Sequence, residues 1–134
     1  IRTGIWQRTG DIGHIDEHGF CHLVDRKNDV IVTGGSNVYP REIEEILYTH
    51  PEVKEALAFG VPDAVWGEKV HALVVPRTAS PAPDAFLDWC ALHLAADKRP
   101  RSVEFVADLP KSDYGKILRR EVRARYWQGR SRLI

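Results

Sequence analysis

Short segments with the spacing of β-strands alternate along this chain of 134 residues with segments that have the spacing of amphipathic helices. A chain of this length forms one ordinary domain. We therefore predict an α+β fold, in which a β-hairpin at residues 9–26 precedes a small mixed sheet that helices cover. The other strands are expected at residues 30–32, 53–61, 70–75 and 103–106.

Three helices are expected between these strands. Pro40 suits the first position of a helix, because its missing N–H costs nothing there, and His50-Pro51 should end that helix. Asp84 is expected to cap the second helix. A basic third helix should run from Lys116 to Trp127, because apolar residues recur there every four positions.

The charge of the chain is balanced overall but divided unevenly along it. Nineteen basic residues match nineteen acidic ones, so no global charge points to nucleic acid or to an anionic membrane. Residues 98–134, however, carry eleven basic residues against four acidic ones. Such a basic end can attract a phosphate-bearing ligand, or it can simply form a solvated helix face, and the sequence leaves both interpretations open.

Cysteine usage and hydropathy bear on the compartment. Cys21 and Cys90 lie far apart and form no CxxC pair, which favours a reducing, cytoplasmic environment over a disulfide scaffold. The apolar runs are too short to span a bilayer. The chain begins at Ile1 and contains no Met, so we expect it to be part of a longer polypeptide.

Two loops contain residue types that suit chemistry. Lys116 follows Gly115 in the segment 110–116, where it is either a cation that can enter another domain's active site or an ordinary surface lysine. The segment 33–37 is too rich in glycine for a regular element, and it lacks the spacing of a phosphate-binding loop. Gly34 and Gly35 either serve a tight turn or let a thin ligand pass close to the backbone.

Three further features are ambiguous when taken singly. Trp66 is either a core plug or a stacking platform, and Asp11 is either a turn residue or an acceptor for two vicinal hydroxyls. His14, His18, Cys21 and His22 have metal-binding side chains, but they fall across a turn and on opposite faces of a strand. We therefore expect no metal site in this chain.

Four stretches, taken in order, resemble the AMP-forming acyl-CoA synthetases of the adenylate-forming superfamily. They are RTGDIGHIDEHGF, LVDRKNDVIVTGGSNVYPREIEEIL, GVPDAVWGEKVHALVV and LPKSDYGKILRREVR, and together they cover nearly the whole chain. The resemblance implies a ligase that uses ATP with Mg²⁺ to adenylate a fatty or aromatic acid and then forms its coenzyme A thioester. It also implies an N-terminal adenylation domain as the partner of this chain.

The resemblance further implies a division of the chain and a role for eight residues. Residues 1–27 would end the adenylation domain, and residues 28–134 would form a mobile C-terminal domain that turns about a hinge at Asn28, where relatives usually have Asp or Lys. Lys116 would be catalytic in adenylation. The ribose would be bound by Asp11 and Arg26, and coenzyme A by Gly34, Gly35, Trp66 and Arg99.

Two other classes of function remain open at this stage, one within the superfamily and one outside it. The parent could load a carrier-protein thiol or act like a luciferase, or the chain could be an interaction module without chemistry. The chain lacks the phosphate loop and acyl pocket of the superfamily, so we expect it to form no acyl-adenylate alone. The sequence names neither the acid nor the oligomeric state.

Overall fold

The computed structural model of the protein describes residues 2–3, 6–7, 11–26 and 29–128. Two short strands, β1 (Arg2–Thr3) and β2 (Trp6–Gln7), pair with each other, and β3 (Asp11–Ile15) pairs with β4 (Cys21–Arg26) in an antiparallel hairpin. Asp16 closes this hairpin, because its Oδ1 accepts hydrogen bonds from the backbone N–H groups of His18 and Phe20. The predicted hairpin is therefore confirmed over its described part.

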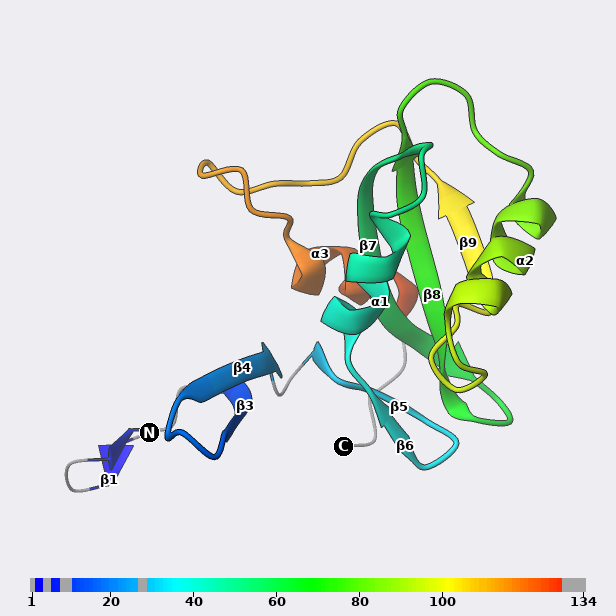
Figure 1. Cartoon of the computed structure of the whole chain (residues 1–134). Coiled ribbons are helices and arrows are strands. Elements are labelled where there is room, and N and C mark those ends of the chain that lie inside the picture. Colours follow the sequence, from blue (N-terminus) through cyan, green and yellow to red (C-terminus); the bar gives the residue numbers. More distant parts are fainter. Residues whose placement is uncertain (1, 4–5, 8–10, 27–28, 129–134) are drawn as a thin grey trace.

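The remaining strands form one five-stranded sheet (Figure 1). They are β5 (Ile31–Thr33), β6 (Ser36–Val38), β7 (Val53–Asp63), β8 (Gly67–Pro76) and β9 (Ser102–Phe105). The long strands β7 and β8 form its antiparallel centre, and β9 lies parallel to β8. The sheet is mixed, as predicted.

Three helices cover this sheet: α1 (Pro40–Leu47), α2 (Pro83–His93) and α3 (Arg119–Tyr126). Apolar residues of α1 and α2, such as Ile43 and Phe86, pack on one face of the sheet, and Val122 of α3 packs with Phe59 on the other face. Because both faces of β7 and β8 are buried, these strands are nearly continuous apolar runs rather than alternating ones. The expected α+β architecture is confirmed.

Several element boundaries differ from the prediction. Gly34 and Gly35 form only the turn between β5 and β6, so the segment 33–37 is a hairpin and not an irregular loop. Likewise, the connection between the strands expected at 53–61 and 70–75 is shorter, because β7 extends to Asp63 and β8 begins at Gly67. In both cases a neighbouring strand supplies hydrogen-bond partners that local composition does not reveal.

Two helix starts also differ. Asp84 does not cap α2, because Pro83 takes its first position and the residue before it, Ala82, makes no side-chain cap. The third helix begins at Arg119 rather than at Lys116, because Ile117 pairs with Lys111 across the preceding loop. In the part of the chain that the structure describes, no helix has the length and apolar character to cross a membrane.

Candidate functional site

A hollow of about 240 Å³ lies beside the turn between β5 and β6 and beside the start of β8. We call it the glycine-turn cavity. It brings together three of the residues assigned above to coenzyme A, which are Gly34, Trp66 and Arg99. Its other lining residues are Thr33, Ser36, Lys69, Val70, Ala96, Asp97 and Arg101. Gly35, the fourth assigned residue, does not line the cavity.

Trp66 forms one wall of the glycine-turn cavity and is held there by its neighbours. Asp63 Oδ2 accepts the backbone N–H of Trp66 at 2.8 Å, and the Gly34 N–H donates to the Trp66 carbonyl at 3.0 Å. A Cβ atom at Gly34 would lie only 2.6 Å from Trp66 Cε3, so the indole occupies the space that a side chain would need. The indole is still 55% exposed, so Trp66 is a surface platform and not a core plug.

The two glycines of the turn are therefore needed for different reasons. Both have a positive φ, 55° at Gly34 and 83° at Gly35, which disfavours any residue with a Cβ. A Cβ at Gly35 would nevertheless meet nothing within 4 Å, whereas one at Gly34 would meet the ring of Trp66. Gly34 thus shapes the cavity wall, and Gly35 serves the turn.

Cations outnumber anions around the glycine-turn cavity. Lys69, Arg99 and Arg101 line it together with one carboxylate, Asp97. The Nε of Arg99 is buried and has no hydrogen-bond partner among the described residues, and Arg101 already donates to the carbonyl of Ala96 at 2.9 Å. Guanidinium groups donate strongly to phosphate oxygens, so this hollow fits a slender ligand that carries phosphate.

Lys116 lies in a second region, at the end of a loop. Hydrogen bonds between the backbone of Lys116 and Ser112 close this loop. The Ser112 N–H donates to the Lys116 carbonyl at 2.8 Å, the Lys116 N–H donates to Ser112 Oγ at 3.3 Å, and Gly115 has a φ of 82°. The Lys116 side chain is exposed, and among the described residues no hydrogen bond or ion pair engages its ammonium group. The backbone of Lys116 is therefore fixed, while its ammonium group can interact with a ligand or with another surface.

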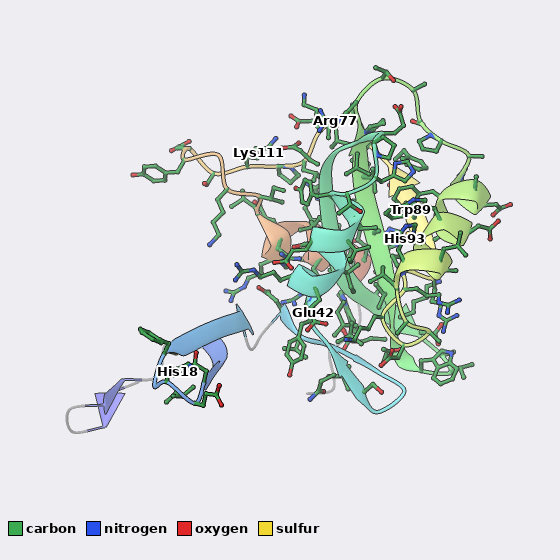
Figure 2. The ribbon with its side chains drawn as sticks, in the orientation of Figure 1. His18, Glu42, Arg77, Trp89, His93 and Lys111 are labelled. Atoms are coloured by element: carbon green, nitrogen blue, oxygen red, sulfur yellow. The ribbon has the colours of Figure 1, made fainter. Side chains whose placement is uncertain are left out.

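Lys111 shows the contrasting behaviour of a structural lysine in the same loop. Figure 2 labels Lys111 on this loop. Its Nζ lies 2.9 Å from Glu55 Oε1 and 3.1 Å from Asp108 Oδ1. The hydrogen bonds to these two carboxylates raise the pKa of Lys111, and the bond from Lys111 is the main cause that lowers the pKa of Asp108. Lys111 therefore ties the base of the loop to β7.

Below the loop, an open groove of about 1050 Å³ runs between α1, β7 and α3. Arg119 spans it: its guanidinium donates to both oxygens of Glu44 at 2.6 and 2.9 Å and to the Ala58 carbonyl at 2.6 Å. Glu44 Oε2 in turn accepts the Ala58 N–H at 2.9 Å. This paired network holds α3, and with it the residues that follow Lys116, against the sheet.

The open groove, whose lining includes Lys116, is called the Lys116 groove. It has no lining residue in common with the glycine-turn cavity. The loop 110–118 and the β5–β6 hairpin lie toward opposite ends of the sheet (Figure 1). The structure thus brings Gly34, Trp66 and Arg99 together and leaves Lys116 apart from them.

The other predicted site residues lie at the N-terminal end. Asp11 and Arg26 are register partners across the β3–β4 hairpin, so their backbones are adjacent, but their side chains are outside the described part. Asn28, the predicted hinge, also lies outside the described residues. Over the described residues, no group of three or more His, Cys, Asp or Glu side chains could hold a metal ion.

Sequence reasoning missed two cations of the glycine-turn cavity, Lys69 and Arg101. Arg101 lies two positions after Arg99, directly before β9, so this pair of closely spaced arginines was an available signal. Lys69 gave no such signal, because only the pairing of β5 with the start of β8 brings it to the cavity.

Comparison with known proteins identifies the domain. The family model for the AMP-binding enzyme C-terminal domain matches residues 42–116. A long-chain-fatty-acid–CoA ligase of Yersinia pestis is 50% identical over 118 residues, which are 88% of this chain and 21% of the ligase. A fatty acid–[acyl-carrier-protein] ligase, ScoC, of Streptomyces coeruleorubidus is 44% identical over 96% of this chain and 25% of its own length.

A solved structure has the same fold. The o-succinylbenzoate CoA synthetase of Bacillus subtilis, in complex with the acyl-adenylate intermediate OSB-AMP, superposes with a TM-score of 0.82 at 36% identity. The match covers 90% of this chain and 25% of the synthetase, so the chain spans between a fifth and a quarter of the proteins that it matches. The chain belongs to the family of AMP-binding enzyme C-terminal domains.

Proposed function

We propose that residues 28–134 are the mobile C-terminal domain of an ATP-dependent acid:CoA ligase, and that residues 1–27 end its adenylation domain. The observation that carries this proposal is the separation of the Lys116 loop from the glycine-turn cavity on one small domain. A neighbouring active site can face only one of these regions at a time. The domain would therefore turn, about Asn28, between the two half-reactions.

In the first half-reaction, a carboxylate oxygen forms a bond to the α-phosphorus of ATP, and the bond from that phosphorus to pyrophosphate breaks. Both reactants are anions, so the step needs a positive charge between them. Lys116 would supply this charge through its ammonium group. Asp11 would accept hydrogen bonds from the ribose hydroxyls, and Arg26 would assist on the same sugar.

In the second half-reaction, coenzyme A supplies a thiol that attacks the acyl carbonyl and releases AMP. Gly34 and Trp66 would flank the narrow pantetheine arm. Arg99, whose buried Nε has no hydrogen-bond partner among the described residues, would bind a phosphate with help from Lys69 and Arg101. The residues present therefore fit this substrate, with Gly35 in the supporting turn.

The proposal includes the setting of the reaction. The substrates are a fatty or aromatic acid, ATP with Mg²⁺ and coenzyme A, with the metal held outside this chain. The enzyme would act in the cytoplasm, where Cys21 and Cys90 remain free thiols. A carrier-protein thiol is the second candidate acceptor, because ScoC is 44% identical to this chain.

The test joins the chain to an adenylation domain. In a chimeric ligase, the chain replaces the matching 21% of the Yersinia pestis ligase, and the control is that ligase without the replaced region. Two reactions are measured: pyrophosphate release with acid and ATP, and thioester formation from supplied acyl-adenylate with coenzyme A or an acyl-carrier protein. We expect the chimeric ligase to perform both, with coenzyme A preferred.

Each other outcome has a definite meaning. A chimeric ligase no more active than the truncated control would contradict a catalytic role for the chain and favour an interaction module. A preference for the carrier protein would show that the acceptor is a carrier-protein thiol and not coenzyme A. The isolated chain should release no pyrophosphate, because it lacks the phosphate loop of the superfamily.

A further inference from the structure

One buried carboxylate, Glu68, has no part in the function proposed above. It is the second residue of β8, directly after Gly67, and only 5% of it is exposed. Its Oε2 accepts a hydrogen bond from the backbone N–H of Val32 in β5 at 3.1 Å. A buried carboxylate carries a desolvation cost, so its presence in a small domain calls for a specific role.

The neighbouring strand leaves room for this side chain. A Cβ atom at Gly60 of β7 would overlap Glu68 Oε1 and would lie 3.1 Å from Glu68 Cδ. Gly60 does not have a positive φ, so a turn does not require glycine there. Glycine at position 60 is therefore explained by the approach of the carboxylate, together with Ile31 Cγ2, which would lie 3.1 Å from the same Cβ.

Glu68 continues a short series of contacts that holds the glycine turn to β8. The Gly34 N–H donates to the Trp66 carbonyl, Thr33 is the register partner of Gly67, and Val32 donates to the Glu68 side chain. Residues 32–34, at the end of β5 and in the turn, are thus held by residues 66–68, at the start of β8. The carboxylate supplies the third link, immediately beyond the Thr33–Gly67 pair.

We propose that Glu68 is a positioning residue that fixes the glycine turn and Trp66 as a unit, and thereby supports the thioester-forming half-reaction. This inference rests on the proposed function, because it assigns Glu68 to the coenzyme A side of the domain. Glu68 touches no reacting atom. It acts through the backbone of β5, which Gly34 follows directly, and it is not among the residues that line the Lys116 groove.

The experiment uses the chimeric ligase with Glu68→Ala, Glu68→Gln and Gly60→Ala, and with Glu45→Ala as a control carboxylate on the exposed surface of α1. Glu68→Ala should lower thioester formation from supplied acyl-adenylate about tenfold, the effect of losing one hydrogen bond to a charged group, and should raise KM for coenzyme A. Pyrophosphate release should change less than twofold. Glu68→Gln retains an acceptor for the Val32 N–H and should recover most of the activity.

Gly60→Ala gives an independent measurement, because it keeps the carboxylate and displaces it. Its thioester formation should fall as in Glu68→Ala, and adding Glu68→Asp, which shortens the side chain, should restore part of the loss. Equal losses in both half-reactions, or no loss in thioester formation, would overturn the positioning role. If the unsubstituted chimeric ligase forms no thioester, the proposed function itself fails, so the two failures are distinguishable.

Discussion

The glycine-turn cavity and the Lys116 loop differ in how firmly their key side chains are held. Trp66 has its backbone N–H fixed by Asp63 and its ring packed on Gly34. Lys116 has only its backbone fixed, and its ammonium group is engaged by none of the described residues. The cavity is therefore shaped within the domain, whereas the lysine needs a second surface to give its charge a partner.

The basic residues of the second half of the chain divide between the same two tasks. Several pair with carboxylates of the first half and hold elements together, as in Arg119 with Glu44 and Lys98 with Glu42. Others, such as Arg99 and Lys69, line the glycine-turn cavity. The sequence left a phosphate site and a solvated face as alternatives for the basic end, and the structure adds a third use in internal ion pairs.

The largest expected effect tests the Lys116 side of this comparison. Lys116→Ala in the chimeric ligase should reduce pyrophosphate release by roughly 10²–10³-fold, because one preorganised cation is lost where negative charge develops. Thioester formation from supplied acyl-adenylate should stay within about twofold, since the glycine-turn cavity lies elsewhere. Both rates are measured on one enzyme preparation.

The control for that experiment removes an equal charge from another exposed site. Lys54→Ala, on β7, should leave both half-reactions unchanged, because Lys54 lines neither hollow. If Lys116→Ala reduces both half-reactions equally, the functional separation of the two regions is wrong.

A smaller effect should distinguish the two glycines of the turn. Gly34→Ala and Gly35→Ala both place a Cβ at positive φ, so each should destabilise the folded chain by roughly 1–2 kcal/mol. Only Gly34→Ala also pushes the Trp66 ring away, so we expect KM for coenzyme A to rise several-fold more in that variant. Chemical unfolding and thioester kinetics measure the two quantities.

Gly34→Ala and Gly35→Ala serve as controls for each other, because both introduce the same kind of backbone strain. Equal KM values for coenzyme A in the two variants would show that the Trp66–Gly34 contact does not shape the binding surface. The domain would then have to bind the substrate through its cations alone.

The smallest expected effect involves His71, a buried residue of β8 in the sheet that supports both regions. Its Nδ1 lies 2.6 Å from Ser102 Oγ, and its ring packs against Phe59 and Tyr126. Burial is the main cause that lowers the pKa of His71 from its usual 6.5, and Lys69 adds to this effect while Glu104 opposes it. Burial, with a further contribution from Glu104, raises the pKa of Tyr126 to about 12.

This lowered pKa predicts how stability depends on pH. Below pH 6.5 the unfolded chain binds a proton at His71 that the folded chain does not, so the free energy of unfolding should fall as pH falls. The loss from one such group cannot exceed about 1.4 kcal/mol per pH unit, and it should fade within about one pH unit above 6.5. Urea unfolding of the chain at pH 7.5, 6.5 and 5.5 measures it.

His71→Gln is the matched variant, because an amide does not titrate in this range. The free energy of unfolding of this variant should depend less on pH between 6.5 and 5.5 than that of the unsubstituted chain. An identical dependence would mean that other groups cause the acid sensitivity. Because His71 lies in the shared sheet, the same acidification should weaken both half-reactions, not one alone.

Much of the architecture follows from local patterns in the sequence. Pro40 and the apolar stripe after it predicted α1, and the apolar runs at 53–61 and 70–75 predicted β7 and β8, because period and breaker residues are local properties. The errors occurred where a distant strand or loop supplied hydrogen bonds, as at Lys116, which was expected to begin a helix.

The sequence by itself determined the fold class, the family resemblance and the chemical type of the candidate residues, since these depend on residue identity and spacing. Only the tertiary structure decided which of them meet. It placed Trp66 on Gly34, brought Lys69 to the cavity that Arg99 lines, and paired Arg119 with Glu44. Such contacts join residues far apart in the chain, and they depend on strand pairing and packing that no local period encodes.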